Sequence, residues 1–87
     1  MRHVIRKGDS TTHGGIVVEG LTNYKIMGRE VSCKGHLVYC PLCKNHYPIM
    51  EGESLMVIGG KEVALEGMKT GCGATLISTQ YLVAIGD

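Results

Sequence analysis

Four side chains of the kind that bind metal ions are spread along the chain at His13, Cys40, Cys43 and Cys72. Thiolates and imidazoles are the usual ligands of a structural zinc site, which takes four of them in a tetrahedral arrangement. Cys40 and Cys43 belong to a Cys-Pro-Leu-Cys knuckle, a spacing that lets two thiolates of one turn reach the same ion. We therefore expect one structural zinc ion bound to these four residues.

Other histidines and cysteines compete for places in this site. His46 is the strongest alternative as the fourth ligand, and His36 is a weaker candidate. Cys33 falls in a predicted strand, where a small buried residue is the expected role, and His3 is expected on a solvated strand face. A lone Cys-x-x-Cys pair also fits a redox or rubredoxin-like site. The assignment therefore needs support from elsewhere in the chain.

An internal repeat gives that support. Residues 18–40 and 50–72 align at an offset of 32 without a gap. Eight residues of the first segment recur in the second: Glu19, Gly20, Ile26, Gly28, Glu30, Val31, Gly35 and Cys40 return as Glu51, Gly52, Ile58, Gly60, Glu62, Val63, Gly67 and Cys72. Self-similarity at a fixed period is typical of a fold built from equivalent units.

A third, partial copy occupies the N-terminal part of the chain. Residues 2–8 match residues 29–35 at an offset of 27, and the same register sets His13 opposite Cys40 and Cys72. Each of the three units then places one metal-binding side chain at the same structural point. An accidental set of ligands has no reason to follow such a register.

The repeating units are patterned as short strands rich in Val, Ile, Thr and Tyr, separated by glycine-containing turns. We predict strands at 4–7, 16–19, 24–27, 30–33, 37–39, 55–58, 62–65, 75–78 and 81–84. Hairpin turns with positive φ are expected at 27–29 and 59–61. The predicted fold is all-β, a small cone or prism of short strands and hairpins with pseudo-three-fold internal repeats and zinc near the tip.

The composition limits both size and location. The 87 residues fit one domain, 1–87 with no extension domain, and a core without Phe or Trp needs support from a metal, a disulfide or a partner. The net charge of +1 and the absence of a basic run argue against a nucleic-acid surface. We expect no signal peptide and no integral membrane segment, because no apolar run is long enough for either.

Four segments together resemble the PAAR-repeat family: residues 8–15, 38–43, 48–52 and 63–76, which extend over nearly the whole chain. The sequence departs from the family pattern at the Pro-Ala-Ala-Arg segment itself. That segment is His-Val-Ile-Arg at 3–6, Glu-Val-Ser-Cys at 30–33 and Glu-Val-Ala-Leu at 62–65. Many members also carry His where Cys43 stands, which leaves the fourth ligand open between Cys43 and His46.

The resemblance implies a structural role and not an enzyme. PAAR proteins are cones that cap the trimeric VgrG spike of the bacterial type VI secretion system, with a flat base on the spike and zinc near the point. It also implies a sharpened tip that makes transient contact with target membranes during puncture, and help in attaching a non-covalent effector. The implied location is the bacterial cytoplasm before firing and the target cell or medium afterwards.

Two other functions suit a small metal-binding chain. A free-standing zinc-ribbon-like module for protein or nucleic acid predicts a basic or aromatic face and no three-fold repeat. A small metallohydrolase predicts an open zinc position beside an unpaired carboxylate in a cleft, for which a chain this short has little room. No arrangement of acid, base and nucleophile is evident around Ser10, Thr11, Thr12 and His13.

Overall fold

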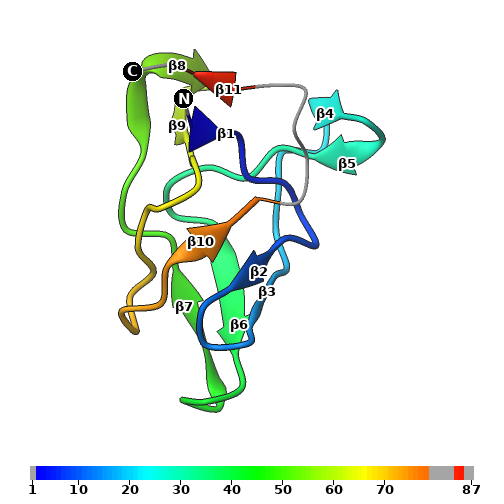
Figure 1. Cartoon of the computed structure of the whole chain (residues 1–87). Helices are drawn as coiled ribbons and strands as arrows, with labels where there is room; N and C mark the ends of the chain where they lie inside the picture. Colours follow the sequence, from blue (N-terminus) through cyan, green and yellow to red (C-terminus); the bar gives the residue numbers. More distant parts are fainter. Residues whose placement is uncertain (1, 79–83, 86–87) are drawn as a thin grey trace.

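The computed structural model describes residues 2–78 and 84–85 and builds them from short strands (Figure 1). In chain order these are β1 (Arg2–His3), β2 (Ser10–Thr11), β3 (Ile16–Val17), β4 (Lys25–Ile26), β5 (Arg29–Glu30), β6 (Leu37–Cys40), β7 (Asn45–Pro48), β8 (Glu53–Ile58), β9 (Lys61–Val63), β10 (Leu76–Ile77) and β11 (Ala84–Ile85). No helix occurs among the described residues, so none of them forms a helix long and apolar enough to cross a membrane. The expected all-β class is confirmed.

Three equivalent segments meet in a closed ring at the centre of the molecule. The amide of Ile5 donates to the carbonyl of Ala64 at 2.9 Å, the amide of Ala64 to Ser32 at 2.9 Å, and the amide of Ser32 to Ile5 at 3.0 Å. Isolated bridges flank this ring, pairing Val4 with Leu65, Arg6 with Val31 and Cys33 with Val63. These contacts reproduce the offsets of 27 and 32 seen in the sequence and confirm the pseudo-three-fold repeat.

Each unit leaves the ring through the same tight turn. A glycine with positive φ occupies the third position of the turn: Gly8 at 96°, Gly35 at 93° and Gly67 at 89°. The next residue turns its side chain back to accept a hydrogen bond from the amide three residues earlier. These acceptors are chemically unlike: Asp9 Oδ2 for Arg6 at 2.8 Å, His36 Nδ1 for Cys33 at 2.8 Å and Met68 Sδ for Leu65 at 3.3 Å.

The core follows the same symmetry. Fully or almost fully buried aliphatic side chains occur in two equivalent sets: Val4, Val31 and Val63 beside the ring, and Val17, Ile49 and Leu76 in or directly after the strands that follow the candidate ligand loops. Burying one such side chain stabilises the fold by about 1.5–3 kcal/mol relative to leaving it exposed. The core is therefore a thin central layer shared by all three units.

The first unit places a polar pair where the other units have less polar side chains. Arg6 is only 4% exposed and stands where Cys33 and Leu65 stand in the other units. Asp9, which is completely buried, accepts the Arg6 amide with one carboxylate oxygen, and the other lies 3.9 Å from Nη2 of Arg29. The Arg6 guanidinium donates to the carbonyl of Ile26 at 3.2 Å. Buried charged groups are tolerated when hydrogen bonds and opposite charges offset their lost hydration.

At one end of the molecule, which we call the base, three two-stranded antiparallel sheets stand in equivalent positions (Figure 1). They pair β4 with β5, β8 with β9, and β1 with β11. The first two are hairpins with two-residue loops, Met27-Gly28 and Gly59-Gly60, in which both residues have positive φ, as a type I′ turn requires. The predicted hairpins are confirmed.

The third sheet of the base joins the two ends of the chain. Arg2 pairs with Ile85 in the register that joins Arg29 with Ile26. The N-terminal unit is partial in the sequence because its outer strand is supplied from the C-terminal end.

The opposite end, which we call the tip, is built on a five-stranded sheet of order β10-β2-β3-β6-β7. The longest hairpin of this sheet is β6–β7, with Leu37 opposite Pro48 and Cys40 opposite Asn45. Its loop and the loop between β2 and β3 lie at the same end in Figure 1. The loops that carry candidate ligands therefore lie at the end opposite the base.

The predicted strands needed several corrections. β1, β2 and β7 were not predicted, and most predicted strands are shorter than expected. The ring segments at 4–7 and 30–33 form isolated bridges for much of their length. Three segments of one chain that meet at an axis can pair with one another over only one or two residues. The predicted strand at 81–84 lies outside the described residues except for Ala84, which begins β11.

Repeated acidic residues serve the backbone. A carboxylate oxygen of Glu19 accepts the amide of Leu37 at 2.8 Å, and the equivalent Glu51 accepts the amide of Lys69 at 2.9 Å. The two glutamates recur in the repeat because each bonds the backbone at the same point of its unit. A carboxylate that is held by a backbone amide has a structural use at this point.

His36 makes the turn of the second unit sensitive to acid. Because Nδ1 accepts the Cys33 amide, the ring is neutral in the folded state. Burial lowers the pKa of His36 from 6.5, helped by Lys61 and opposed by Glu19 and Glu30. The unfolded chain therefore binds a proton first as the pH falls. The stabilisation is complete above about pH 6.5 and is lost as the pH falls through the folded pKa.

We expect His36→Met, which copies Met68 of the third unit, to flatten the pH dependence of stability. The thioether still accepts the Cys33 amide but does not titrate. Urea denaturation between about pH 7 and pH 5, the range in which histidine titrates, should show a steeper loss of unfolding free energy for the unsubstituted protein. Parallel pH profiles for the two proteins would contradict the role of His36.

Candidate metal centre

Two of the four predicted ligands occupy equivalent turns. His13 lies in a turn closed by the amide of Gly14 donating to the carbonyl of Thr11 at 3.0 Å, and Cys72 lies in a turn closed in the same way by Gly73 and Thr70 at 3.0 Å. Both glycines have positive φ, 75° and 87°, which glycine adopts without steric cost. The repeat therefore places the imidazole and the thiol at the same point of two units.

The second unit supplies two ligands from a longer loop. Cys40 ends β6 and pairs with Asn45 at the start of β7, so residues 41–44 form the loop between them. The loop closes through Lys44, which has a positive φ of 56°. Cys43 stands in this loop, and Cys40 is almost fully buried beneath it.

The four side chains meet at the tip. One ligand atom from each of His13, Cys40, Cys43 and Cys72 lies within 4.8 Å of all the others. Nδ1 of His13 is 3.6 Å from Sγ of Cys40 and 3.7 Å from Sγ of Cys72. The sequence-predicted set is thus brought together, and its members could hold a metal ion.

The donor spacing fits a tetrahedral zinc site. Zinc bonds of about 2.0–2.3 Å to nitrogen and sulfur give tetrahedron edges of about 3.3–3.8 Å. The two nitrogen–sulfur distances that involve His13 fall within this range. A donor set of three sulfurs and one nitrogen also suits zinc better than calcium or magnesium, which prefer oxygen.

The surroundings favour a thiolate at Cys72. Burial opposes its ionisation, but hydrogen bonds from the Thr70 hydroxyl, the Ala74 amide, Cys40 and His13 outweigh burial and lower the pKa of Cys72 to about 6. The Thr70 oxygen lies 3.2 Å from the sulfur. Because a thiolate is the form that ligates metal, this position is prepared for an ion at neutral pH.

Cys43 differs from Cys72 in its electrostatic setting. Its pKa is raised, first by its hydrogen bond to Cys40, then by burial and by the negative charge of its cysteine neighbours. A cation held among the sulfurs would offset this repulsion and favour the thiolate form of Cys43. The pKa of Tyr47 beside the cluster is raised too, by burial and then by the charge of Cys43.

The remaining candidates lie elsewhere. His46 is exposed on β7, its ring set edge-on against Tyr39 with centroids 5.2 Å apart, and it is not a member of the four-residue group. His36 caps its turn as described above. Cys33 is completely buried, and burial raises its pKa to about 11, which agrees with the expected role as a small buried residue.

His3 is less solvated than expected. It is half-buried on β1, and its Nδ1 lies 2.8 Å from a carboxylate oxygen of Glu66. That contact depends on the pairing of the first and third units at the base. The strand pattern around His3 gives no sign of it.

Comparison with protein families connects this geometry to known proteins. The family model described as PAAR motif matches residues 7–78, a span that contains all four clustered side chains and two of the three ring segments. A search of curated proteins found no match.

We expect the purified protein to contain one zinc ion per chain, measured by elemental analysis. Cys72→Ser and His13→Ala should each lose most of the metal. They should also lower the melting temperature by about 15 °C or more, because losing a ligand present at 1,000 times its Kd costs about 4 kcal/mol and each kcal/mol shifts a domain of this size by about 4–8 °C.

Cys33→Ala provides the matched control, since this thiol is buried outside the cluster. It should keep the metal while losing some stability. If the purified protein contained no metal, and a chelator left its melting temperature unchanged, packing alone would hold the tip.

Proposed function

The chain belongs to the PAAR-motif family of type VI secretion spike-tip proteins, and from that premise we propose that it caps the VgrG trimer with its base and directs its metal-stapled tip outward. The family is structural rather than catalytic. A capping protein must present one surface to three identical chains. It must also hold its free end rigid under load.

The observation that carries the proposal is the closed three-unit ring with three equivalent sheets at the base. A single chain with this arrangement offers three similar contact surfaces about one axis. Each chain of a trimeric spike would then meet nearly the same backbone geometry. One copy of this protein would suffice for three copies of the spike chain.

The base also exposes apolar side chains. Leu55 is 85% exposed and Val57 53% exposed on β8, while Met27 in the β4–β5 turn is 63% exposed. A small hollow of about 170 Å³, lined by residues that include Leu21, Tyr24 and Ile58, lies between the loop before β4 and the end of β8. Exposed apolar surface of this kind marks a site of protein association.

We propose zinc as the ion at the tip, bound by His13, Cys40, Cys43 and Cys72. Zinc there would supply a structural cross-link without redox chemistry. Residues 41–46, which form the second unit's loop and the start of β7, are all exposed, so apolar burial does little to hold them. An ion that joins this loop to the turns of the other two units would stiffen the tip.

The rest of the role follows from the same orientation. The chain would act as a single domain in the bacterial cytoplasm before firing and leave with the spike. Its tip would touch the target membrane only in passing. An effector could accompany it through non-covalent contacts.

We expect Leu55→Glu to abolish binding to the VgrG trimer, because it places a charge at the most exposed apolar position among the described side chains of the base. Native mass spectrometry of the mixed proteins should show one chain per trimer for the unsubstituted protein and free chain for the variant. Leu42→Glu is the matched control, since Leu42 is 68% exposed but belongs to the loop at the tip. Loss of binding in Leu42→Glu, with retention in Leu55→Glu, would mean that the proposed orientation is reversed.

A further inference from the structure

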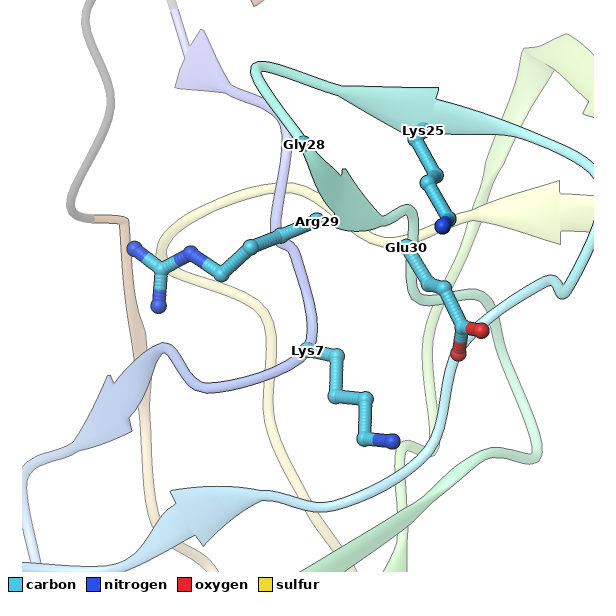
Figure 2. Close-up of a pocket in the computed structure, with 5 residues that line it drawn as sticks. All are labelled: Lys7, Lys25, Gly28, Arg29 and Glu30. Carbon is cyan, nitrogen blue, oxygen red and sulfur yellow. The ribbon is translucent and has the colours of Figure 1, made fainter.

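A positively charged pocket lies where the first and second units meet, at the end away from the metal centre. It has a volume of about 370 Å³ and is lined by Lys7, Lys25, Gly28, Arg29 and Glu30 (Figure 2). Two separate stretches of chain contribute: the turn after β1, which carries Lys7, and the β4–β5 hairpin, which carries the other four residues. Neither the ring nor the proposed metal site uses these side chains.

The backbone fixes the pocket in place. The amide of Lys7 donates to the carbonyl of Glu30 at 2.7 Å, and Lys25 stands directly opposite Glu30 in the β4–β5 hairpin. Figure 2 shows the guanidinium of Arg29 on one side and the ammonium of Lys7 and the carboxylate of Glu30 on the other. The cations therefore flank the hollow from two sides.

The pocket concentrates charge. Its three cations and one carboxylate leave a net charge of +2, although the whole chain carries only +1. Arg29 lies 3.9 Å from the fully buried Asp9, yet its side chain remains 41% exposed. An arginine already positioned by a buried carboxylate loses little conformational freedom when it binds a second acidic group.

The repeat provides an internal comparison. At the junction of the second and third units, Lys34, Lys61 and Glu62 stand where Lys7, Arg29 and Glu30 stand at the first, and the amide of Lys34 donates to Glu62 at 2.8 Å in the same way. Val57 takes the place of Lys25 opposite the glutamate. That junction therefore has one cation fewer.

The junction of the third and first units is neutralised from within. Glu66 stands there in place of a lysine, and its carboxylate lies 2.8 Å from Nδ1 of His3. Arg2 donates from Nε to the carbonyl of Glu66 at 3.0 Å. The first junction therefore carries the largest excess of positive charge, +2 from Lys7, Lys25, Arg29 and Glu30, against +1 from Lys34, Lys61 and Glu62 at the second.

We propose that this pocket binds an acidic peptide segment of a second protein, one segment per chain. A contact that is repeated at all three junctions would suit the three identical chains of a trimer. A charged pocket at one junction alone suits a partner that binds with one copy per chain. Cations on both sides of the hollow suit a segment with more than one carboxylate. A nucleic acid would require a basic stripe that continues along the surface, and lysines and arginines elsewhere are scattered. This interaction is additional to spike capping.

Fluorescence anisotropy of a labelled heptapeptide of alternating Glu and Asp tests the proposal, with the matching Gln and Asn peptide as the neutral probe. The unsubstituted protein should bind only the acidic peptide, more weakly at about 0.15 M than at about 0.01 M salt. Lys7→Gln combined with Lys25→Gln should weaken binding about tenfold, since each exposed ion pair contributes about threefold. Both lysines are exposed, so the double variant should fold normally, which its melting temperature checks.

Lys34→Gln combined with Lys61→Gln is the matched control, because it removes the same number of charges at the equivalent junction. Binding within about twofold of the unsubstituted protein is expected for this control. An equal loss in both double variants would reduce the effect to general surface charge and overturn the proposal. The proposal would also be overturned if the acidic peptide did not bind, while a single-stranded oligonucleotide or anionic vesicles bound in a way that depends on Lys7 and Lys25. Leu55→Glu should bind the peptide normally, which separates this result from that of spike capping.

Discussion

Three backbone hydrogen bonds join Ile5, Ser32 and Ala64 in a closed ring whose residues are completely buried. Each segment donates a hydrogen bond to one neighbour and accepts one from the other. If one unit unfolds, the remaining two therefore lose a partner for one buried amide and one buried carbonyl. Leaving a buried backbone group unsatisfied costs about 1–3 kcal/mol. The ring therefore makes the three units one cooperative structure, although little apolar volume is available to join them.

The positions of both ends of the molecule follow from this ring. The chain reaches the ring from the base sheets and leaves it through three equivalent glycine turns, so the ligand loops come out at related angles about one axis. This is why His13, Cys40 and Cys72 meet although 27 and 32 residues separate them in the sequence. At the base the same rotation sets three two-stranded sheets around the axis.

The sequence revealed the symmetry because equivalent backbone positions demand the same residue where space or φ is restricted. Gly20 and Gly52 recur because a Cβ at either would lie within 2.7 Å of the side chain of Glu30 or Glu62. Strand β7 escaped prediction because Asn45 and Pro48 are poor strand formers, and its pairing with β6 overrides their preference. The pairing of β11 with β1 in the first unit was not predicted, because the two strands come from opposite ends of the chain.

Side-chain roles were harder to predict than backbone positions. Asp9, His36 and Met68 perform the same hydrogen-bonding task with a carboxylate, an imidazole and a thioether. Chemical dissimilarity hides such an equivalence, and only the position in the repeat points to it. The candidate ligands were easier to predict. Metal binding is one of the few roles that a cysteine and a histidine share, so finding both types at one position of the repeat points to it.

Three-fold repetition does not by itself give the number of ligands that a structural zinc site needs, and the second unit supplies the additional candidate. Three equivalent positions give three ligands, whereas a structural zinc ion takes four. The buried strand residue follows its ligand by four positions in the first and third units, His13 to Val17 and Cys72 to Leu76, but by nine in the second, Cys40 to Ile49. The additional residues form the loop that carries Cys43.

A symmetric trimer of identical chains would have to insert this loop three times and would supply six ligands, whereas a single chain with internal repeats can insert it once. The same freedom permits two buried charged residues, Arg6 and Asp9, in the first unit alone and one charged junction on an otherwise three-fold backbone.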